Sequence, residues 1–347
     1  MRIRRVFIVL AILVLLAAAA GLFLYWWLQP ARHFRSADIP VLAAPDQQSA
    51  ADRPSTAAGR SREALHSGVQ GNRSPERQNP DNPGSDQVSN GQVSLNILVL
   101  GIDARGKEDS RTDVMMLAKV NVDRNTVDLV SIPRDTRVQL PGVGFTKINH
   151  AHLLGELRGG NHSGTKASLQ AVSDLCGCSI NYYIKTNFAG FEHFINTLGG
   201  LEVSLPAPVK LTYAHRTLPA GKQVLNGDTA LKLVQERKSL SEGDRGRQSN
   251  QALVLKSVLR TLLKPANLAR LPELIQQVRQ DILDTNLEDG DILSLSLLAK
   301  EMGAEDIKYH QIPGHSDKLY DPLVKKELYY WIPDLAQLRG IYKNNVK

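Results

Sequence analysis

The stretch that decides the fold runs from Ser94 to Thr136. It begins with SLNILVLGID (Ser94–Asp103), an apolar run interrupted by a glycine, which is typical of a buried strand. The next apolar segments are VMMLAKVNV (Val114–Val122) and TVDLVSI (Thr126–Ile132). The polar turn between these two segments predicts that they form a β-hairpin.

Helical patterns alternate with these strands along the rest of the chain. The predicted helices span Thr165–Leu175, Phe188–Leu198, Asn226 to about Arg237, Arg247–Lys264, Leu287–Met302 and Pro333–Tyr342, and a late strand spans Ile307–Ile312. Strands interleaved with helices predict an α/β domain with a mixed central sheet. Residues 94–347 are enough for one large core, and we expect the part after Pro265 to complete its covering layers. The aromatic run Tyr329-Tyr330-Trp331 suits contact with either sugar or membrane and is left unassigned.

The N-terminus predicts a membrane anchor. Residues 1–5 are basic, and residues 6–28 contain no charged side chain and end in Tyr25-Trp26-Trp27. As a helix, such a run reaches about 35 Å, enough to cross a hydrocarbon core of about 30 Å. The run is longer than the apolar region of a cleaved signal peptide. The positive-inside rule keeps residues 1–5 in the cytoplasm and puts the remainder outside a cell membrane that is crossed once.

The segment from 29 to 93 predicts a flexible linker, because it is rich in small and polar residues and poor in aromatic ones. The formal net charge is +7. No run of Lys and Arg in the domain from residue 94 marks a nucleic-acid footprint, so we expect no nucleic-acid partner.

Two cysteines, Cys176 and Cys178, lie in LCGCS. Two cysteines cannot form a multi-disulfide or zinc pattern. They are either two buried thiols near a helix end or a tight disulfide formed in an oxidising compartment.

Charged side chains gather where the predicted strands end. Asp103 follows the first strand, Arg111 and Asp113 precede the second, and Arg134 follows the third in SIPRDT. Loop residues at neighbouring strand ends can converge at one sheet edge, where open α/β sheets bind ligands. Two carboxylates, Asp103 and Asp113, suit Mg²⁺. Arginine matches phosphate oxygens in a bidentate manner.

A second polar group comes from more distant segments. Arg237 ends one predicted helix, Arg247 begins another, and Gln251 lies one helical turn later. Lys147 and Asn149 lie in the loop GFTKINH. Taken singly, an arginine and an aspartate at a strand end are more often a surface ion pair than a site.

The order and content of these segments resemble the LytR-CpsA-Psr family of cell-envelope glycopolymer phosphotransferases. The matching strings lie between about Leu95 and Leu263. They are NILVLGID, RTDVMML, VDLVSIPRDTRV, FTKINHAH, NYYIKTNFAGF, LGGLEVSLP, LNGDTALKL and GDRGRQ.

The resemblance implies a three-layer α/β/α domain with an apolar pocket for a polyprenyl lipid and a charged mouth. It implies transfer of an anionic glycopolymer from a polyprenyl-pyrophosphate carrier to a peptidoglycan sugar hydroxyl, with Mg²⁺ as cofactor. By the same resemblance, Mg²⁺ is held by Asp103 and Asp113. It also implies that the pyrophosphate is bound by Arg111, Arg134, Arg237 and Arg247. Around them lie Lys147, Asn149 and Gln251.

This chain departs from the family pattern at Gln235 and Asn250, where arginine is common. The departures keep two alternatives open. One is a non-catalytic envelope module that binds polyprenyl-phosphate lipids or anionic polymers. The other is a membrane-bound transcriptional attenuator, which the predicted orientation and the absence of a helix-turn-helix pattern disfavour.

Overall fold

The computed structural model describes residues 25–45, 88–89, 92–103, 110–262, 264, 266–267, 270–279, 281–303 and 305–343. The predicted cytoplasmic tail (1–5), most of the predicted membrane span (6–28) and most of the predicted linker (29–93) lie outside these residues. Within the described part of the chain, no helix combines the length and apolar character needed to cross a bilayer.

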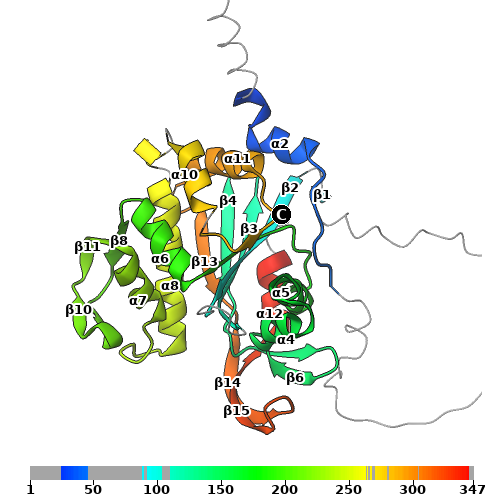
Figure 1. Cartoon of the computed structure of the whole chain (residues 1–347). Coiled ribbons are helices and arrows are strands. Elements are labelled where there is room, and N and C mark those ends of the chain that lie inside the picture. The colour runs from blue at the N-terminus through cyan, green and yellow to red at the C-terminus, as the bar shows by residue number, and fades with distance from the viewer. Residues whose placement is uncertain are drawn as a thin grey trace, which may run out of the picture.

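A seven-stranded mixed sheet forms the centre of the molecule (Figure 1), and its main strand order is β12-β7-β2-β3-β4-β13. Its strands are β1 (Val88–Ser89), β2 (Gln92–Ile102), β3 (Thr112–Asn121), β4 (Thr126–Ser131), β7 (Tyr182–Asn187), β12 (Asp284–Thr285) and β13 (Ile307–Gln311). Strands β2, β3 and β4 are antiparallel to one another, whereas β7 runs parallel to β2 and β13 parallel to β4. The pairing of β3 with β4 confirms the predicted hairpin.

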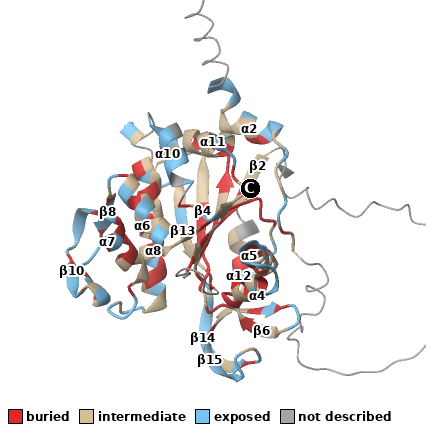
Figure 2. Ribbon diagram, viewed as in Figure 1, coloured by how far each residue is buried: buried red, intermediate tan, exposed pale blue. Residues whose placement is uncertain are grey.

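One face of the sheet is covered by α4 (His150–Gly159), α5 (Asn161–Cys176) and α12 (Leu335–Lys343). Successive side chains of a strand point to opposite faces of the sheet, and Leu98 and Leu100 of β2 point to this one. They are fully buried and pack with Val172 of α5 and Leu338 of α12. Figure 2 shows the buried residues along this face.

The opposite face carries α2 (Pro30–Ser36), α11 (Asp289–Lys300) and α8 (Asp244–Leu262). At the start of β2, Phe34 of α2 is buried against Leu95. Further along, below α8, the apolar side chains Val99, Val114 and Ala118 are only half-buried. The helices on this face therefore bury the start of β2 fully and its later part only partly.

A lateral lobe follows the central sheet strand β7 (Figure 1). It contains α6 (Phe188–Thr197), β8 (Leu201–Leu205), β9 (Val209–Leu211), the 3-10 turn η2 (Thr212–Ala214), β10 (Arg216–Leu218), β11 (Gly221–Leu225) and α7 (Gly227–Gln235), and α10 (Leu271–Val278) packs beside α6. The lobe has its own apolar core, to which α8 contributes Val254 and Val258. Helix α8 thus joins the lobe to the sheet.

Two further hairpins lie at the end of the sheet away from α2 (Figure 1). They are β5 (Arg137–Leu140) with β6 (Gly144–Lys147), and β14 (Gly314–Asp321) with β15 (Lys326–Pro333). Neither hairpin was predicted from the sequence, and the second contains the aromatic run Tyr329-Tyr330-Trp331.

The mixed α/β class is confirmed, with shifted boundaries. Helix α7 ends at Gln235, so Arg237 lies beyond it, and α8 begins at Asp244, which puts Arg247 inside its first turn. The domain also begins earlier than predicted. Residues 30 to 43 pack on it, because Phe34 is buried and Ala43 forms a β-bridge with Ile180. This part of the predicted linker is folded, and the single aromatic residue Phe34 supplies its anchor.

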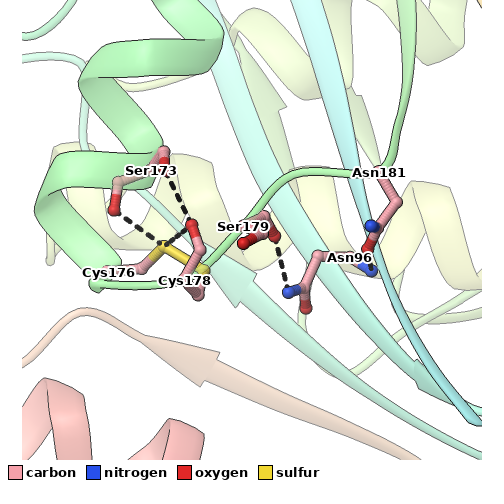
Figure 3. Close-up of a disulfide and its surroundings, with 6 residues drawn as sticks. All are labelled: Asn96, Ser173, Cys176, Cys178, Ser179 and Asn181. Carbon is pink, nitrogen blue, oxygen red and sulfur yellow. Dashed lines mark hydrogen bonds between the residues drawn. A yellow bond between two sulfur atoms is a disulfide. The ribbon is translucent and has the colours of Figure 1, made fainter. Parts of the chain in front are cut away.

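Cys176 and Cys178 form a disulfide, which selects the second of the two alternatives (Figure 3). The bridge encloses Gly177, which ends α5 with φ 65°, a left-handed conformation that suits glycine. The next turn is fixed to the sheet, since the Asn96 side chain donates a hydrogen bond to the carbonyl of Ser179 at 2.7 Å. The bridge therefore fixes the path from α5 into β7.

Candidate functional site

A β-bulge places Asp113 at the end of the sheet. Gly101 pairs with Val114, whereas Ile102 pairs with Thr112, so Asp113 is the extra residue of β3. A bulge re-aims the side chain that it carries. Glycine suits the bulge, because a Cβ on Gly101 would make a tight contact of 3.0 Å with Cβ of Val114. The bulge between β2 and β3 thus determines where the Asp113 carboxylate lies.

Arg134 meets Asp113 directly. Its NH1 donates a hydrogen bond to Oδ1 of Asp113 at 2.7 Å, and its Nε lies 3.8 Å from Oδ2 of Asp135. Lys147 donates from Nζ to Oδ1 of Asp135 at 2.6 Å. Burial works against the charge of Arg134, but Asp113, Asp135 and Asp244 outweigh it and raise the pKa of its guanidinium. The structure therefore brings three predicted parts of the site together: Asp113, the segment SIPRDT and the segment GFTKINH.

Arg247 enters the same cluster from α8. It is buried, with its NH2 2.7 Å from Oδ1 of Asp244 one turn earlier on the helix. Burial lowers the pKa of its guanidinium; Asp244 opposes this, and the charges of Arg134 and Arg237 add to the lowering. We call Arg134, Arg237, Arg247, Asp113 and Asp244 the arginine cluster. Three cations near one another, one of them buried, predispose the cluster to bind an anion.

Asp103 and Arg111 lie at the same end of the sheet but meet through the backbone. Oδ1 of Asp103 accepts a hydrogen bond from the Arg111 N–H at 2.7 Å, and the Asp103 N–H donates to the Arg111 carbonyl at 3.1 Å. Burial lowers the pKa of His150, and the charges of Arg111 and Lys147 add to the lowering. Arg111 is exposed.

Several buried polar atoms at this site have no hydrogen-bond partner in the described part of the chain. They include Nε of Arg134, Nε of Arg247, Oδ1 of Asn149 and Oε1 of Gln248. Buried polar groups are nearly always paired, and an unpaired one is costly. Unpaired guanidinium N–H groups beside other cations are what a site for an anionic ligand requires.

The donor set also fits a divalent cation. Asp103 follows Ile102, and Asp113 follows Thr112, the residue that pairs with Ile102 across neighbouring strands. Mg²⁺ commonly takes one or two carboxylates and completes its shell with phosphate oxygens and water. The described residues contain no group of three or more acidic, histidine or cysteine side chains placed to hold a metal ion. A cation held here would therefore depend on its ligand for part of its coordination.

Some contributions were missed or differ from the prediction. Asp135, Asp244 and Gln248 were not among the predicted site residues. The spacing of Asp244 three residues before Arg247 on a helix was the signal that could have found it. Gln251 is buried, but its side-chain amide donates to the Val234 carbonyl at 3.2 Å. Gln251 therefore ties α8 to α7.

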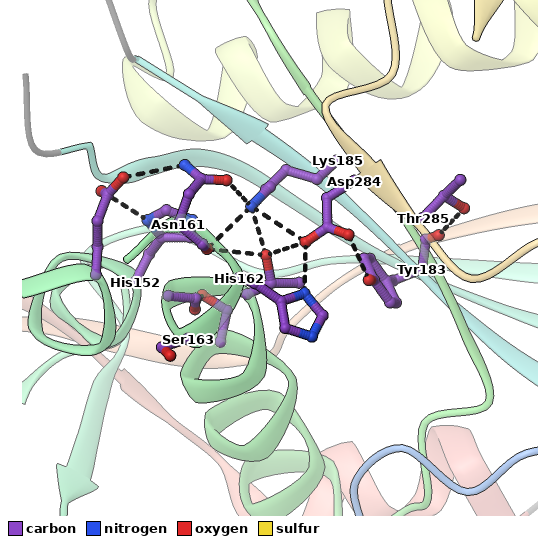
Figure 4. A network of polar contacts seen from close by, with 12 residues as sticks. His152, Asn161, His162, Ser163, Tyr183, Lys185, Asp284 and Thr285 are labelled. Carbon is purple, nitrogen blue, oxygen red and sulfur yellow. Dashed lines mark hydrogen bonds and ion pairs between the residues drawn. The ribbon is translucent and has the colours of Figure 1, made fainter. Parts of the chain in front are cut away.

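A second buried charge lies elsewhere, around Lys185 of β7 (Figure 4). Its Nζ donates to Thr165 Oγ1 at 2.5 Å and to Asn161 Oδ1 at 2.5 Å, and lies 3.5 Å from Asp284 Oδ2. Tyr183 donates its hydroxyl to the other oxygen of Asp284 at 2.7 Å. Burial lowers the pKa of Lys185, and the charge of Asp284 opposes this. We call these residues the Lys185 network.

The chain matches the model of the LytR_cpsA_psr family over residues 62–346. The match covers most of the chain, and the chain belongs to this family.

Named relatives share this domain. The polyisoprenyl-teichoic acid–peptidoglycan teichoic acid transferase TagU of Bacillus cereus is 31% identical over 267 residues, which cover 76% of this chain and 82% of TagU. The protein of the same name from Oceanobacillus iheyensis is 32% identical over 260 residues, 74% of this chain and 77% of that protein.

Solved structures agree with the fold. The crystal structure of B. subtilis TagV has a TM-score of 0.61 at 27% identity and covers 72% of this chain and 95% of TagV. A structure of TagT bound to LIIa-WTA has a TM-score of 0.58 at 25% identity and covers 77% of this chain and 92% of TagT.

Proposed function

We propose that this protein is a transferase that moves an anionic cell-wall glycopolymer from a polyprenyl-pyrophosphate carrier to a sugar hydroxyl of peptidoglycan. The observation that carries the proposal is the arginine cluster with its unpaired, buried Nε atoms on Arg134 and Arg247. The names of the TagU relatives, which specify transfer of teichoic acid to peptidoglycan, support the same reaction.

The chemistry is a phosphoryl-group transfer. The acceptor hydroxyl oxygen forms a bond to the phosphorus that carries the glycopolymer, and the bond from this phosphorus to the bridging oxygen breaks. Polyprenyl phosphate leaves with the electron pair, and the hydroxyl proton passes to a carboxylate of the site. Such reactions depend mainly on positioning and charge stabilisation. Arg134 and Arg247 supply both, with Arg111, Arg237 and Lys147 around them.

Mg²⁺ is part of the proposal, with Asp103 and Asp113 as its protein ligands. Bound there, it would neutralise charge on the pyrophosphate oxygens. Arg134 holds one oxygen of Asp113 at 2.7 Å and so orients this carboxylate toward the site.

An apolar path for the lipid is supported by the sheet face below α8. Val99, Val114 and Ala118 are half-buried there, although they lie in central strands of the sheet. Central strands covered by helices normally bury such residues fully. We propose that the polyprenyl chain covers these side chains when it is bound.

Membrane attachment through residues 6–28 is likewise a proposal. The described part of the chain begins with Tyr25, Trp26 and Trp27, which are 54%, 47% and 48% exposed, and aromatic rings favour the membrane interface. Only a few residues separate them from Phe34, which is buried against the start of β2. At about 3.3 Å per residue, β2 then places the site roughly 30 Å farther from that surface. The domain would stand outside the cell on the membrane, with the site on its far end.

The test is a transfer assay with the full-length chain in detergent, a polyprenyl-pyrophosphate-linked glycopolymer, Mg²⁺ and peptidoglycan fragments. Arg134→Ala and Arg247→Ala should lose turnover. Arg260→Ala, at the exposed far end of α8, is the matched control and should keep it. Undiminished turnover in Arg247→Ala would overturn the assignment. Tight binding of the lipid by the parent, without transfer to any acceptor, would instead establish the non-catalytic alternative.

A further inference from the structure

A cleft of about 340 Å³ opens beside the arginine cluster, between the β14–β15 hairpin and the starts of α8 and α12. Its wall includes Arg245, His315, Trp331, Asp334 and Gln337. A second cleft of about 180 Å³ adjoins it and shares Arg245, Ile312 and Trp331 with the first. Because the second cleft also contains Asp135, Asp244 and Gln248, the two form one groove that ends at the candidate site.

The hairpin is fixed against the site loop by backbone contacts. Thr136 bridges to Trp331, and the Trp331 N–H donates to the Asp135 carbonyl at 2.9 Å. The Trp331 indole is held too, since its Nε1 donates to the Ile312 carbonyl at 3.1 Å. Trp331 is thus a rigid wall that joins SIPRDT to the C-terminal segment.

Strand alternation sorts the aromatic run into two roles. Tyr330 is buried, and its hydroxyl donates to Asp321 at 2.6 Å, so it supports the hairpin. Tyr329 and Trp331 point to the other face, which lines the groove. Tyr329 is 44% exposed. Burial raises the pKa of its hydroxyl, and the charges of Asp135 and Asp244 add to this, which locates the ring beside the arginine cluster.

The groove has the chemistry of a sugar site rather than of a second anion site. Two aromatic rings offer flat apolar faces, while the Gln337 amide, the His315 imidazole and the Asp334 carboxylate offer hydrogen-bond donors and acceptors. Carboxylates at Glu242, Asp244 and Asp334 outnumber the guanidinium of Arg245. An anionic polymer would meet these carboxylates unfavourably, whereas a neutral ring with many hydroxyl groups would not.

We propose that this groove is the acceptor subsite, and that it binds the N-acetylhexosamine rings of a glycan strand with Tyr329 and Trp331 as stacking walls. The proposal rests on the transferase function proposed above and names the part of the site that receives the acceptor. A glycan in this groove places a sugar hydroxyl next to Asp135 and Asp244, at the edge of the arginine cluster. The hairpin then determines which acceptor is used.

The chain offers a direct optical probe, because its tryptophans are Trp26, Trp27 and Trp331. In the full-length Trp26→Phe/Trp27→Phe variant in detergent, all tryptophan emission comes from Trp331. Titration with a soluble peptidoglycan tetrasaccharide should shift this emission in a saturable manner. Tyr329→Ala should weaken the apparent affinity at least tenfold, whereas Tyr213→Ala, an exposed tyrosine of the lateral lobe, should leave it unchanged.

Transfer kinetics give a second readout. In Tyr329→Ala the KM for the acceptor should rise about tenfold with the KM for the lipid donor unchanged, a split expected for a residue that touches only the acceptor. An unchanged acceptor KM would overturn the groove assignment while transfer itself continued. The groove assignment would also be overturned if a soluble polyglycerol phosphate displaced the tetrasaccharide at a lower concentration. The groove would then belong to the donor. Saturable binding of the tetrasaccharide by a protein without transfer activity would support the groove and contradict the transferase function.

Discussion

The arginine cluster and the Lys185 network are both partly buried groups of cations and aspartates, yet they differ in how their hydrogen bonds are used. Lys185 donates to Asn161 and Thr165 and lies beside Asp284, so its donors are met inside the protein. In the arginine cluster, Nε of Arg134 and Nε of Arg247 are buried without a hydrogen-bond partner in the described part of the chain. The first group is complete, and the second is left open.

This difference separates a structural role from a binding role. A buried charge that has all its partners stabilises the conformation that supplies them, and removal of one partner is expensive. Unpaired donors cost stability in the free protein and are retained where a ligand completes them. Residue type alone gives no such distinction, since both groups contain a conspicuous cation and an aspartate.

The largest expected effect is on turnover in the open cluster. Arg247→Ala should lower kcat by about 10²–10³-fold, the range for removal of one preorganised charge that stabilises a transition state. Its melting temperature should change little, because burial and the charges of Arg134 and Arg237 disfavour the Arg247 cation, and this offsets the loss of its ion pair with Asp244. Turnover and melting temperature, measured together, check this. A large fall in melting temperature would remove the distinction between the two groups.

The next effect is on stability in the complete network. Lys185→Met keeps much of the side-chain volume but leaves Asp284 without its buried cation, and should lower the free energy of unfolding by about 3 kcal/mol. Denaturant unfolding measures it, and Lys166→Met, on the surface of α5, is the control. Turnover per folded molecule should stay near that of the parent. A stability change within 0.5 kcal/mol of the control, on the order of ordinary surface substitutions, would contradict this role.

A smaller effect concerns pH. Burial lowers the pKa of His152, and the charge of Lys185 adds to this; burial also lowers the pKa of His150. As the pH falls below the ordinary pKa of histidine, His150 and His152 become protonated in the unfolded chain before they do in the folded protein. Stability from these histidines is therefore present above about pH 6.5 and decreases as the pH falls, by at most about 1.4 kcal/mol per pH unit for each histidine.

Unfolding midpoints between pH 7.5 and 5 measure this dependence. His152→Gln should flatten the profile, and the exposed His315→Gln should leave it as it is. An unchanged slope in His152→Gln would mean that the buried ring is not kept neutral by its surroundings.

The smallest effect comes from an added cation. Gln235 ends α7, two residues before Arg237 of the arginine cluster. Gln235→Arg should lower the KM for the lipid donor a few-fold, or about 1 kcal/mol, and this gain should weaken at high salt. Donor KM at low and high ionic strength checks it. A gain that is independent of salt would point to a change in packing.

Much of the fold follows from local signals in the sequence. The strand run Leu95–Gly101, the polar turn after Val122 and the cap at Asn226 each carry their own information. The cap is seen directly, since the Asn226 side chain accepts a hydrogen bond from the Thr229 N–H at 3.0 Å. Charged residues at strand ends likewise indicated the convergence of Asp113 and Arg134.

What the sequence could not show depends on long-range contacts. The burial of Phe34 against β2 joins a short helix to a strand far along the chain, so composition alone predicted a linker there. The bridge from Thr136 to Trp331, which builds the groove, joins segments that lie still farther apart in the sequence. Which buried donors lack partners is a property of the folded state alone.

Thermal unfolding of the full-length chain with a short-chain polyprenyl pyrophosphate shows whether the lipid pyrophosphate binds to the arginine cluster. A ligand that completes the open donors should raise the melting temperature of the parent, and above its Kd the rise should follow the logarithm of ligand concentration. Lys185→Met should keep this rise from its lower starting point, and the Arg134→Ala/Arg247→Ala variant should lose it. Equal rises in the parent and the double-arginine variant would show that the lipid pyrophosphate binds elsewhere, and would contradict the account.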